Sequence, residues 1–369
     1  MKLVCSKSNL LNGVQIVSKA VSNKTTMSIL ECVMIDATKG SITLTANDMD
    51  LGIETIIEGD IIEKGAIALD AKIFLEIVRK LPDSNITIET DSSFKTIITC
   101  EKAKFNIIGK SGEDFSYLPV VEKNDSIIIS QFTLKEVVRQ TIFSISDNDN
   151  NKLMTGELFE INDDELKVVS LDGHRISIRK IQLKNRYSPK KVIVPGKTLN
   201  EVSKILPGGA DNDVIISFTD KHIVFEFGNT TVVSRLIEGE YFRIDQMLSN
   251  DYETKVKINK KEFLNCIDRA TLLVKEGDKK PIIINILDGT MELKINSILG
   301  SMNEDIDIEK QGKDLMIGFN PKFLIDALRV IDDEDVDLYM VNPKAPCFIK
   351  NQEESYIYLI LPVNFTTVS

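Results

Sequence analysis

A seventeen-residue block occurs three times in this chain at a fixed spacing of 125 residues. Each copy opens with a short apolar run and continues with apolar residues at helical spacing. Solenoid repeats have periods of about 20–50 residues, so a longer period without slippage indicates three copies of one domain. The copies are AIALDAKIFLEIVRKLP from Ala66, KVIVPGKTLNEVSKILP from Lys191 and MIGFNPKFLIDALRVID from Met316.

Each block carries the same three charges on one helix face. A lysine is followed four residues later by an acid, and three residues after that by a base. One such lysine–acid pair is an ordinary surface pair worth about 0.2–0.5 kcal/mol. Its recurrence in all three domains favours a repeated inner surface, as in a ring. The residues are Lys72, Glu76 and Arg79, then Lys197, Glu201 and Lys204, then Lys322, Asp326 and Arg329.

The chain of 369 residues fits three domains of ordinary size, which we place at 1–124, 125–250 and 251–369. Because Trp is absent and aromatic residues make up only 6%, the cores should consist mainly of Ile, Leu and Val. No low-complexity linker separates the domains, so we expect them to pack edge to edge. The fold class is α+β, with two helices per domain packed on antiparallel sheets.

Helices and strands are expected at matching places in the three domains. The predicted helices are 7–20, 70–81, 133–143, 197–206, 259–275 and 320–331. Alternating β-branched runs with Gly, Asn or Asp at the turns predict hairpins at 42–59, 166–183 and 291–308. A later hairpin recurs at 85–100, 213–228 and 335–350.

The charge is unevenly distributed. The predicted helices carry 15 Lys and Arg against 7 Asp and Glu, which is +8 in a chain of net charge −11 and leaves −19 elsewhere. One interpretation is that lysines simply prefer exposed helix faces, although Glu is an equally good helix former and is scarce here. The other is that basic helices surround a polyanion, holding phosphates without reading base sequence.

Several classes of protein are disfavoured. The five cysteines are scattered and never spaced as CxxC, which favours buried reduced thiols in a cytosolic protein over disulfides or a metal site. No signal peptide or apolar run of membrane-spanning length is recognised, so we expect no membrane partner. The cluster Asp172-Gly173-His174-Arg175 is the one candidate catalytic site, and it leaves a cytosolic hydrolase-like repeat enzyme as the alternative function. No cofactor is expected.

The whole chain resembles the bacterial DNA polymerase III β subunit, the replicative sliding clamp. The resemblance is carried by TGELFEINDDELKVVSLDGHRISI from Thr155, VIVPGKTLNEVSKIL from Val192, LIEGEYFRID from Leu236, MIGFNPKFLIDAL from Met316 and YLILPV from Tyr358. It implies a head-to-tail homodimer, a closed ring that encircles duplex DNA without sequence specificity. It also implies that the protein is not an enzyme but tethers the polymerase III catalytic subunit. The clamp loader, repair polymerases, mismatch-repair proteins and ligase would be further partners, in the cytoplasm at the nucleoid.

The resemblance also implies a pocket that binds short linear peptides. Phe242 stands where the family usually has proline, and the chain ends in NFTTVS where many members end in Met-Arg-Leu or similar. Without the resemblance, these distant apolar segments would be read as core. The implied pocket residues are Met154, Leu171, Gly173, His174, Arg175, Ile176, Phe242, Met247, Ile360, Leu361, Pro362 and Val363.

Two further surfaces are expected from the resemblance and the repeated block. The dimer seam would join the first domain to the third through Phe105, Ile107, Leu272, Leu273, Glu304 and Asp305, with Lys72, Lys102 and Lys104 facing the two acids. The groups facing DNA would be Lys24, Lys72, Arg79, Asn148, Lys152, Lys197, Lys204 and Arg329. A third hypothesis, an adaptor that binds peptides but not DNA, would lack the second surface.

Overall fold

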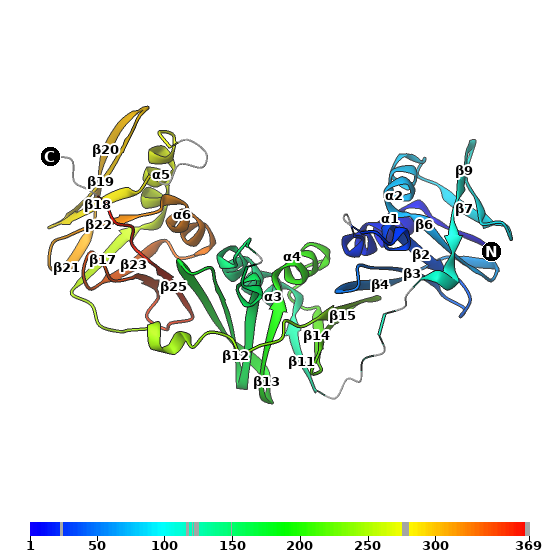
Figure 1. The fold of residues 1–369 in the computed structure, drawn as a ribbon, viewed down its shortest axis with the longest axis horizontal. Coiled ribbons are helices and arrows are strands. Elements are labelled where there is room, and N and C mark those ends of the chain that lie inside the picture. The colour runs from blue at the N-terminus through cyan, green and yellow to red at the C-terminus, as the bar shows by residue number, and fades with distance from the viewer. Residues whose placement is uncertain are drawn as a thin grey trace. The chain divides into compact units, whose positions relative to one another are not determined.

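The computed structural model describes residues 1–22, 25–115, 118–119, 121, 125–148, 150–274 and 280–365. Within these residues the chain forms six α-helices and four antiparallel sheets (Figure 1). No helix of this part of the chain is long and apolar enough to cross a membrane. The helices are α1 (Lys7–Val17), α2 (Ala71–Lys80), α3 (Gln131–Thr141), α4 (Gly196–Ile205), α5 (Lys260–Thr271) and α6 (Pro321–Val330).

All six predicted helices are present, and the starts of four of them follow from capping chemistry. A polar residue directly before the helix accepts a hydrogen bond from a first-turn amide. The caps are Ser6 for α1, Asp70 for α2, Asn259 for α5 and Asn320 for α6. The main difference is at α5, which ends four residues earlier than predicted. Leu272 and Leu273 there turn back to the carbonyls of Arg269 and Ala270.

The strands form sheets of five, nine, seven and four members. In spatial order, the five-stranded sheet is β5 (Asp60–Glu63), β1 (Lys2–Ser6), β7 (Asn85–Thr90), β8 (Lys95–Cys100) and β9 (Ala103–Ile108). The nine-stranded sheet is β10 (Lys110–Ser111), β6 (Ala66–Asp70), β2 (Cys32–Asp36), β3 (Ile42–Asn47), β4 (Leu51–Ile57), β16 (Thr230–Arg235), β15 (His222–Phe227), β14 (Asp213–Phe218) and β11 (Asp125–Ser130).

The other two sheets hold the rest of the strands. The seven-stranded sheet is β12 (Gly156–Leu171), β13 (Arg175–Pro195), β25 (Tyr356–Ile360), β24 (Cys347–Lys350), β23 (Asp335–Met340), β17 (Thr254–Asn259) and β21 (Glu309–Gly312). The four-stranded sheet is β20 (Gly300–Asp307), β19 (Thr290–Ser297), β18 (Ile282–Leu287) and β22 (Leu315–Phe319). The predicted early hairpins are therefore β3–β4, β12–β13 and β19–β20, and the later ones are β7–β8, β14–β15 and β23–β24.

Strand pairing crosses both of the expected domain boundaries. β4 of the first domain pairs with β16 of the second, and β13 of the second pairs with β25 of the third. By compactness the chain divides into two units, Met1–Thr133 with Lys197–Leu236 and Leu134–Gly196 with Ile237–Ser369. The central domain therefore contributes to both units.

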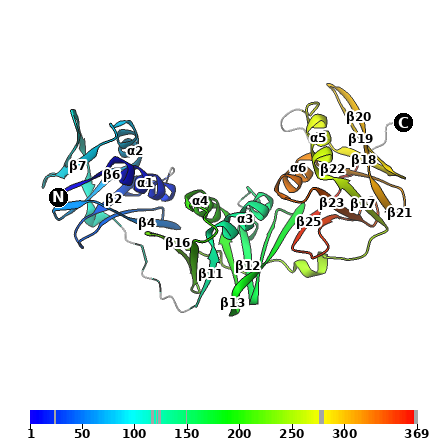
Figure 2. The ribbon, with the colours of Figure 1, turned by 180° about the vertical axis from the view of Figure 1, so that it is seen from behind.

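The two helices of an outer domain lie side by side over its sheets, α1 with α2 and α5 with α6 (Figures 1 and 2). In the first domain, a side chain at Gly13 of α1 would lie 2.6 Å from Ile57 Cγ2 and 2.8 Å from Leu44 Cδ1. Only glycine allows α1 to approach β3 and β4 this closely. In the third domain, α5 and α6 bury Phe263, Ile267, Leu324 and Leu328 in one core with β18, β19 and β22.

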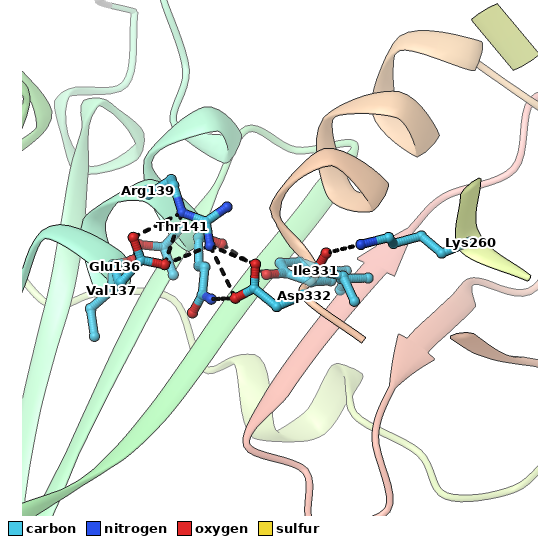
Figure 3. A network of polar contacts seen from close by, with 9 residues as sticks. Glu136, Val137, Arg139, Thr141, Lys260, Ile331 and Asp332 are labelled. Atoms are coloured by element: carbon cyan, nitrogen blue, oxygen red, sulfur yellow. Dashed lines mark hydrogen bonds and ion pairs between the residues drawn. The ribbon is translucent and has the colours of Figure 1, made fainter. Parts of the chain in front are cut away.

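A polar bridge joins α3 to the end of α6 within the second unit (Figure 3). The Arg139 guanidinium lies 2.6 Å from Glu136 on its own helix and 3.2 Å from both Asp332 oxygens. Gln140 donates to the same carboxylate at 3.4 Å. Asp332 stands where the first two blocks have a proline. Because Asp332 is largely exposed, the bridge fixes geometry more than it stabilises the fold.

A buried acid lies beneath α3. Glu157 of β12 is fully buried, and neither of its carboxylate oxygens has a hydrogen-bond partner among the residues that the structure describes. Burial raises the pKa of Glu157 to about 8. The nearby Thr141 hydroxyl lowers that pKa only in part, because it donates its own hydrogen bond to Val137 O at 2.7 Å.

This acid predicts a pH-dependent stability. The pKa of Glu157 is raised in the folded chain from an ordinary value of 4.5, so the free energy of unfolding falls as pH rises from about 4.5 through about 8. Glu157→Gln removes this loss, since the amide stays neutral. The difference in melting temperature between the variant and the parent should therefore grow from pH 5 to pH 8, in favour of the variant. Parallel thermal melts that show a constant difference would mean that Glu157 is ionised in the fold.

Candidate functional site

An apolar cavity of about 410 Å³ lies in the second unit. Segments that are far apart in the sequence meet there: the turn before β12, the β12–β13 hairpin, the stretch after β16, the loop before β24 and the chain at the end of β25. Nine of the twelve residues expected in the pocket line the cavity. The lining is Met154, Leu171, Gly173, His174, Arg175, Ile176, Phe242, Met247, Pro346, Leu359 and Leu361.

The cavity has a buried floor and an exposed rim. Leu171, Ile176 and Leu359 are at most 6% exposed. Met247 and Leu361 are 52% and 37% exposed. An apolar concavity with a few polar groups at its edge is suited to anchoring apolar side chains of a ligand.

The hairpin turn at the edge of the cavity is held by one aspartate. Asp172 Oδ1 accepts from the His174 amide at 2.9 Å and from the Arg175 amide at 3.1 Å. Gly173 between them has φ +86°, a conformation that other residues rarely adopt. The turn thereby directs His174 and Arg175 to the cavity wall.

The segment after β25 is fastened to this turn and then leaves the cavity. Leu361 N donates to His174 O at 2.9 Å, and Val363 N donates to Gly318 O of β22 at 2.8 Å. Three residues expected in the pocket lie outside the lining of this cavity. Pro362 and Val363 lie beyond the lining, and Ile360 is 1% exposed in the core of the third domain.

Two residues that line the cavity, Leu359 and Pro346, are not among those expected from the sequence. Side chains alternate along a strand, so Leu359 and Leu361 share the face opposite Ile360. That alternation was available as a signal for Leu359, once one of the two was known to line the cavity. Pro346 comes from the loop between β23 and β24, and no pattern in the sequence indicates it.

The geometry gives no support to catalysis by the Asp172-Gly173-His174-Arg175 cluster. Asp172 uses Oδ1 on the turn amides and Oδ2 on Arg175 Nε, at 3.0 Å. The His174 ring instead stacks on Phe323, with ring centroids 6.0 Å apart. Among the described residues, no hydroxyl or thiol is hydrogen-bonded to the imidazole, so the nucleophile–base–acid chain of a hydrolase is not assembled.

The expected DNA-facing side chains of the described residues are exposed, but most have acidic neighbours. Arg79 pairs with Glu76, Lys204 with Glu201 at 2.8 Å, Arg329 with Asp268 at 3.3 Å, and Lys197 with Asp48. Each base is more than 45% exposed, so these pairs are weak and leave the bases available to another anion.

Lys72, Asn148 and Lys152 are also exposed, whereas Lys24 lies outside the described residues. In no repeat does the block lysine pair with the acid four residues later. The acid binds the base three residues later in the first two repeats. In the third repeat, Asp326 binds Arg175 instead.

The expected seam residues lie on or beside two sheet edges. β9 ends the five-stranded sheet and β20 ends the four-stranded sheet. Phe105 on β9 is 39% exposed and Leu272 beside α5 is 78% exposed, while Leu273 packs partly against the core. Asp305 is exposed, but Glu304 is bound by Arg269, which lowers the pKa of Glu304.

Comparison with known proteins gives one consistent result. The chain matches family models of the DNA polymerase III beta subunit: the N-terminal domain over residues 1–119, the central domain over 128–242 and the C-terminal domain over 245–364. It is 33% identical to a Staphylococcus epidermidis protein named beta sliding clamp, over 98% of this chain and 99% of that one.

Two solved structures are similar over nearly the whole chain. A putative DNA polymerase III beta subunit from Eubacterium rectale is 76% identical, with a TM-score of 0.97, covering 99% of this chain and 100% of that one. The DNA polymerase sliding clamp from Bacillus subtilis is 34% identical, with a TM-score of 0.95 and the same coverage.

Proposed function

The chain belongs to the DNA polymerase III beta subunit family and is a DNA sliding clamp, and from that premise we propose how it closes around DNA and where it holds its partners. The family is a non-catalytic subunit, so the protein is not an enzyme. Two copies join head to tail into a ring around duplex DNA. The apolar cavity then holds short peptides of the polymerase and of other replication proteins.

The main support for the proposed ring is the pairing of strands at the boundaries between domains within the chain. At each of the two internal boundaries, the second strand of an early hairpin, β4 or β13, pairs with a late strand of the next domain, β16 or β25. The third domain has the same hairpin strand, β20, and the first domain has the same late strand, β9. Both are sheet edges in this chain, and unpaired edges are templates for pairing with another chain.

A boundary between β20 of one copy and β9 of the next would complete the series. It would join the four-stranded sheet of one copy to the five-stranded sheet of the next. The resulting sheet would have nine strands, the same number as the sheet that crosses the first internal boundary. Head-to-tail contacts of this kind form a closed ring when the rotation closes. Three domains per chain in two copies give six domains around the ring.

The internal boundaries also indicate a register for the proposed seam. Leu51, the first residue of β4, pairs with Ser234, the next-to-last residue of β16. Arg175, the first residue of β13, pairs with Ile360, the last residue of β25. Gly300, the first residue of β20, would therefore lie opposite one of the last two residues of the partner's β9.

The faces of the two strands select between those alternatives. Phe105 and Ile107 share a face with buried residues of β8, and Met302 shares a face with buried Ile295 of β19. Paired residues point to the same side of a sheet. Gly300 then lies opposite the partner's Ile107, which sets Met302 opposite Phe105, Asn303 opposite Lys104 and Asp305 opposite Lys102.

This register predicts a specific cross-link. With Lys104→Cys and Asn303→Cys in one chain, the Cα atoms across the seam would be about 4.5–5.5 Å apart, within disulfide range. Mild oxidation should therefore give a covalent dimer closed at two seams. The five native cysteines are buried and should not compete.

The matched control combines Lys104→Cys with Asp305→Cys, which keeps the same face but is displaced by two residues, to about 7–8 Å. Gel electrophoresis without reductant should show the dimer for the first pair and little for the control. Equal cross-linking of both, or of neither, would refute the register.

The same variant tests the ring itself. Oxidation in the presence of a nicked circular plasmid should leave some protein linked to the circle in detergent. Reductant or a cut in the plasmid should release it, because the link is topological. Protein that cross-links to dimers but is never retained on the circle would argue for a dimer that does not surround DNA.

The DNA-facing surface is proposed to consist of the exposed bases of the repeated helices together with Asn148 and Lys152. Phosphate contacts by such groups carry no sequence information and weaken steeply with salt. A mobile clamp needs this kind of contact, because it must accept every sequence. An adaptor that binds peptides alone would show no salt-dependent retention on circular DNA.

The cavity is proposed to dock short linear peptides from the polymerase III catalytic subunit, the clamp loader and repair proteins. Its floor suits apolar anchors, and its rim offers the exposed His174 as a polar contact, while the buried Arg175 forms part of the wall. A peptide with few anchors should bind at roughly micromolar Kd, since it loses conformational freedom on docking. With these partners, the proposed place of action is the cytoplasm, at the nucleoid.

The exposed rim allows a test that spares the core. Met247→Ala with Leu361→Ala should raise the Kd for a synthetic peptide of the polymerase catalytic subunit's C-terminal tail by about tenfold or more, through lost apolar burial. Met27→Ala is the matched control, because Met27 is 49% exposed and lies in the other unit. Unchanged affinity in calorimetry would exclude this cavity as the docking site. Deleting the chain from Leu359 would be a poorer test, because it also removes Ile360 from the core.

A further inference from the structure

Arg175 forms part of the cavity wall, yet its guanidinium is held from outside the cavity. The residue is 7% exposed. Its Nε donates to Asp172 at 3.0 Å and its Nη1 donates to Asp326 Oδ2 of α6 at 2.7 Å. Its Nη2 donates to Phe143 O. A buried guanidinium with three acceptors is stabilised only while all three remain, since an unpaired buried charge is costly.

The helix α6 contacts two lining residues in succession. The Arg175 guanidinium lies over the Phe323 ring, 4.5 Å from its centroid, and His174 stacks on the same ring. Phe323 and Asp326 are three residues apart, so they share one face of α6. That face therefore fixes the position of both polar groups at the cavity.

Comparison of the boundaries within the chain shows that this arrangement is particular to the third repeat. The turn after β3 has its own aspartate, Asp48, which accepts from turn amides as Asp172 does. At that boundary, the side chain that pairs with the turn aspartate Asp48 is Lys197 of the helix α4. At the cavity the turn supplies the cation, Arg175, and the helix supplies a carboxylate, Asp326.

The acids of the repeated blocks differ in the same way. Glu76 and Glu201 each pair with a base on their own helix. Asp326 is the block acid that pairs instead with a residue 151 positions away in the sequence. An ordinary helix-surface role does not explain that difference.

We propose that Asp326 is a positioning residue for peptide docking, which keeps the cavity open by holding the Arg175 guanidinium against α6. This proposal rests on the docking function proposed above and assigns part of it to a residue outside the lining. Without the carboxylate, Arg175 Nη1 loses its acceptor while still buried. The adjoining open space is the 410 Å³ cavity, so the guanidinium turns into it and competes with the peptide's apolar anchors.

The test compares three substitutions, with the fluorescein-labelled tail peptide of the polymerase catalytic subunit as probe. Asp326→Asn keeps the shape but removes the charge, and it should raise the Kd by about tenfold, the loss of one charge-assisted hydrogen bond. Asp326→Glu keeps the carboxylate and should restore binding to within about twofold of the parent. Glu76→Gln, the counterpart acid in the first repeat, should leave the Kd unchanged.

A second readout separates positioning from general damage to the fold. In samples with labelled arginine, the Nε–H resonance of Arg175 should shift and exchange faster with water in Asp326→Asn but not in Asp326→Glu. Thermal melts of all three variants establish that they are folded. Folded Asp326→Asn that binds the peptide like the parent, or with an unmoved Arg175 resonance, overturns the proposal. Loss of binding in Asp326→Glu equal to that in Asp326→Asn also overturns it.

Failure of the underlying function has a different signature. If the parent protein itself does not bind the peptide, both the proposed docking cavity and the proposed role of Asp326 are wrong. If the parent binds and only the Asp326 variants behave otherwise than expected, the docking cavity stands and the positioning role alone is wrong.

Discussion

The requirement that backbone hydrogen bonds at a sheet edge be satisfied is the constraint on which the rest of this molecule depends. Each domain ends its early hairpin with a strand whose outer edge needs a partner. β4 and β13 find theirs in the next domain, and this pairing converts a chain of repeats into continuous sheets. Among the described residues, β20 and β9 have no such neighbour in their own chain. The assembly proposed here is the same pairing repeated once more, between copies.

The three domains share one repeated frame, and the docking site proposed here uses positions at which the repeats differ. The block acid and base form a short-range pair on α2 and α4, which leaves these helices as weakly paired basic surfaces. On α6 the acid instead binds Arg175, a residue of the cavity wall. The bridge from Arg139 to Asp332 likewise uses a residue that replaces the proline of the other blocks (Figure 3). A repeated domain can thus supply similar basic helix faces three times and, in the second unit, the apolar cavity that we propose for docking.

The sequence predicted what depends on local periodicity. The helices follow from apolar spacing and from caps such as Asp70 and Asn320, and the hairpins follow from alternation and turn residues. Contacts between residues that are far apart in the sequence could not be predicted in this way. The link between Arg175 and Asp326 has no local signal, because it depends on which face of α6 meets the hairpin turn. The lining by Leu359 in place of Ile360 depends on which face of β25 is turned to the cavity.

Amide hydrogen exchange of β9, measured over a range of protein concentrations, tests the central claim most directly. An open edge exchanges quickly, whereas an edge paired with another copy is protected in proportion to the fraction assembled. Exchange on β9 and β20 should therefore be slow at high concentration and should accelerate on dilution. β5, the other edge of the same five-stranded sheet, should exchange quickly throughout. If β9 exchanges as quickly as β5 at every concentration, no second copy pairs with it, and the ring is not built in this way.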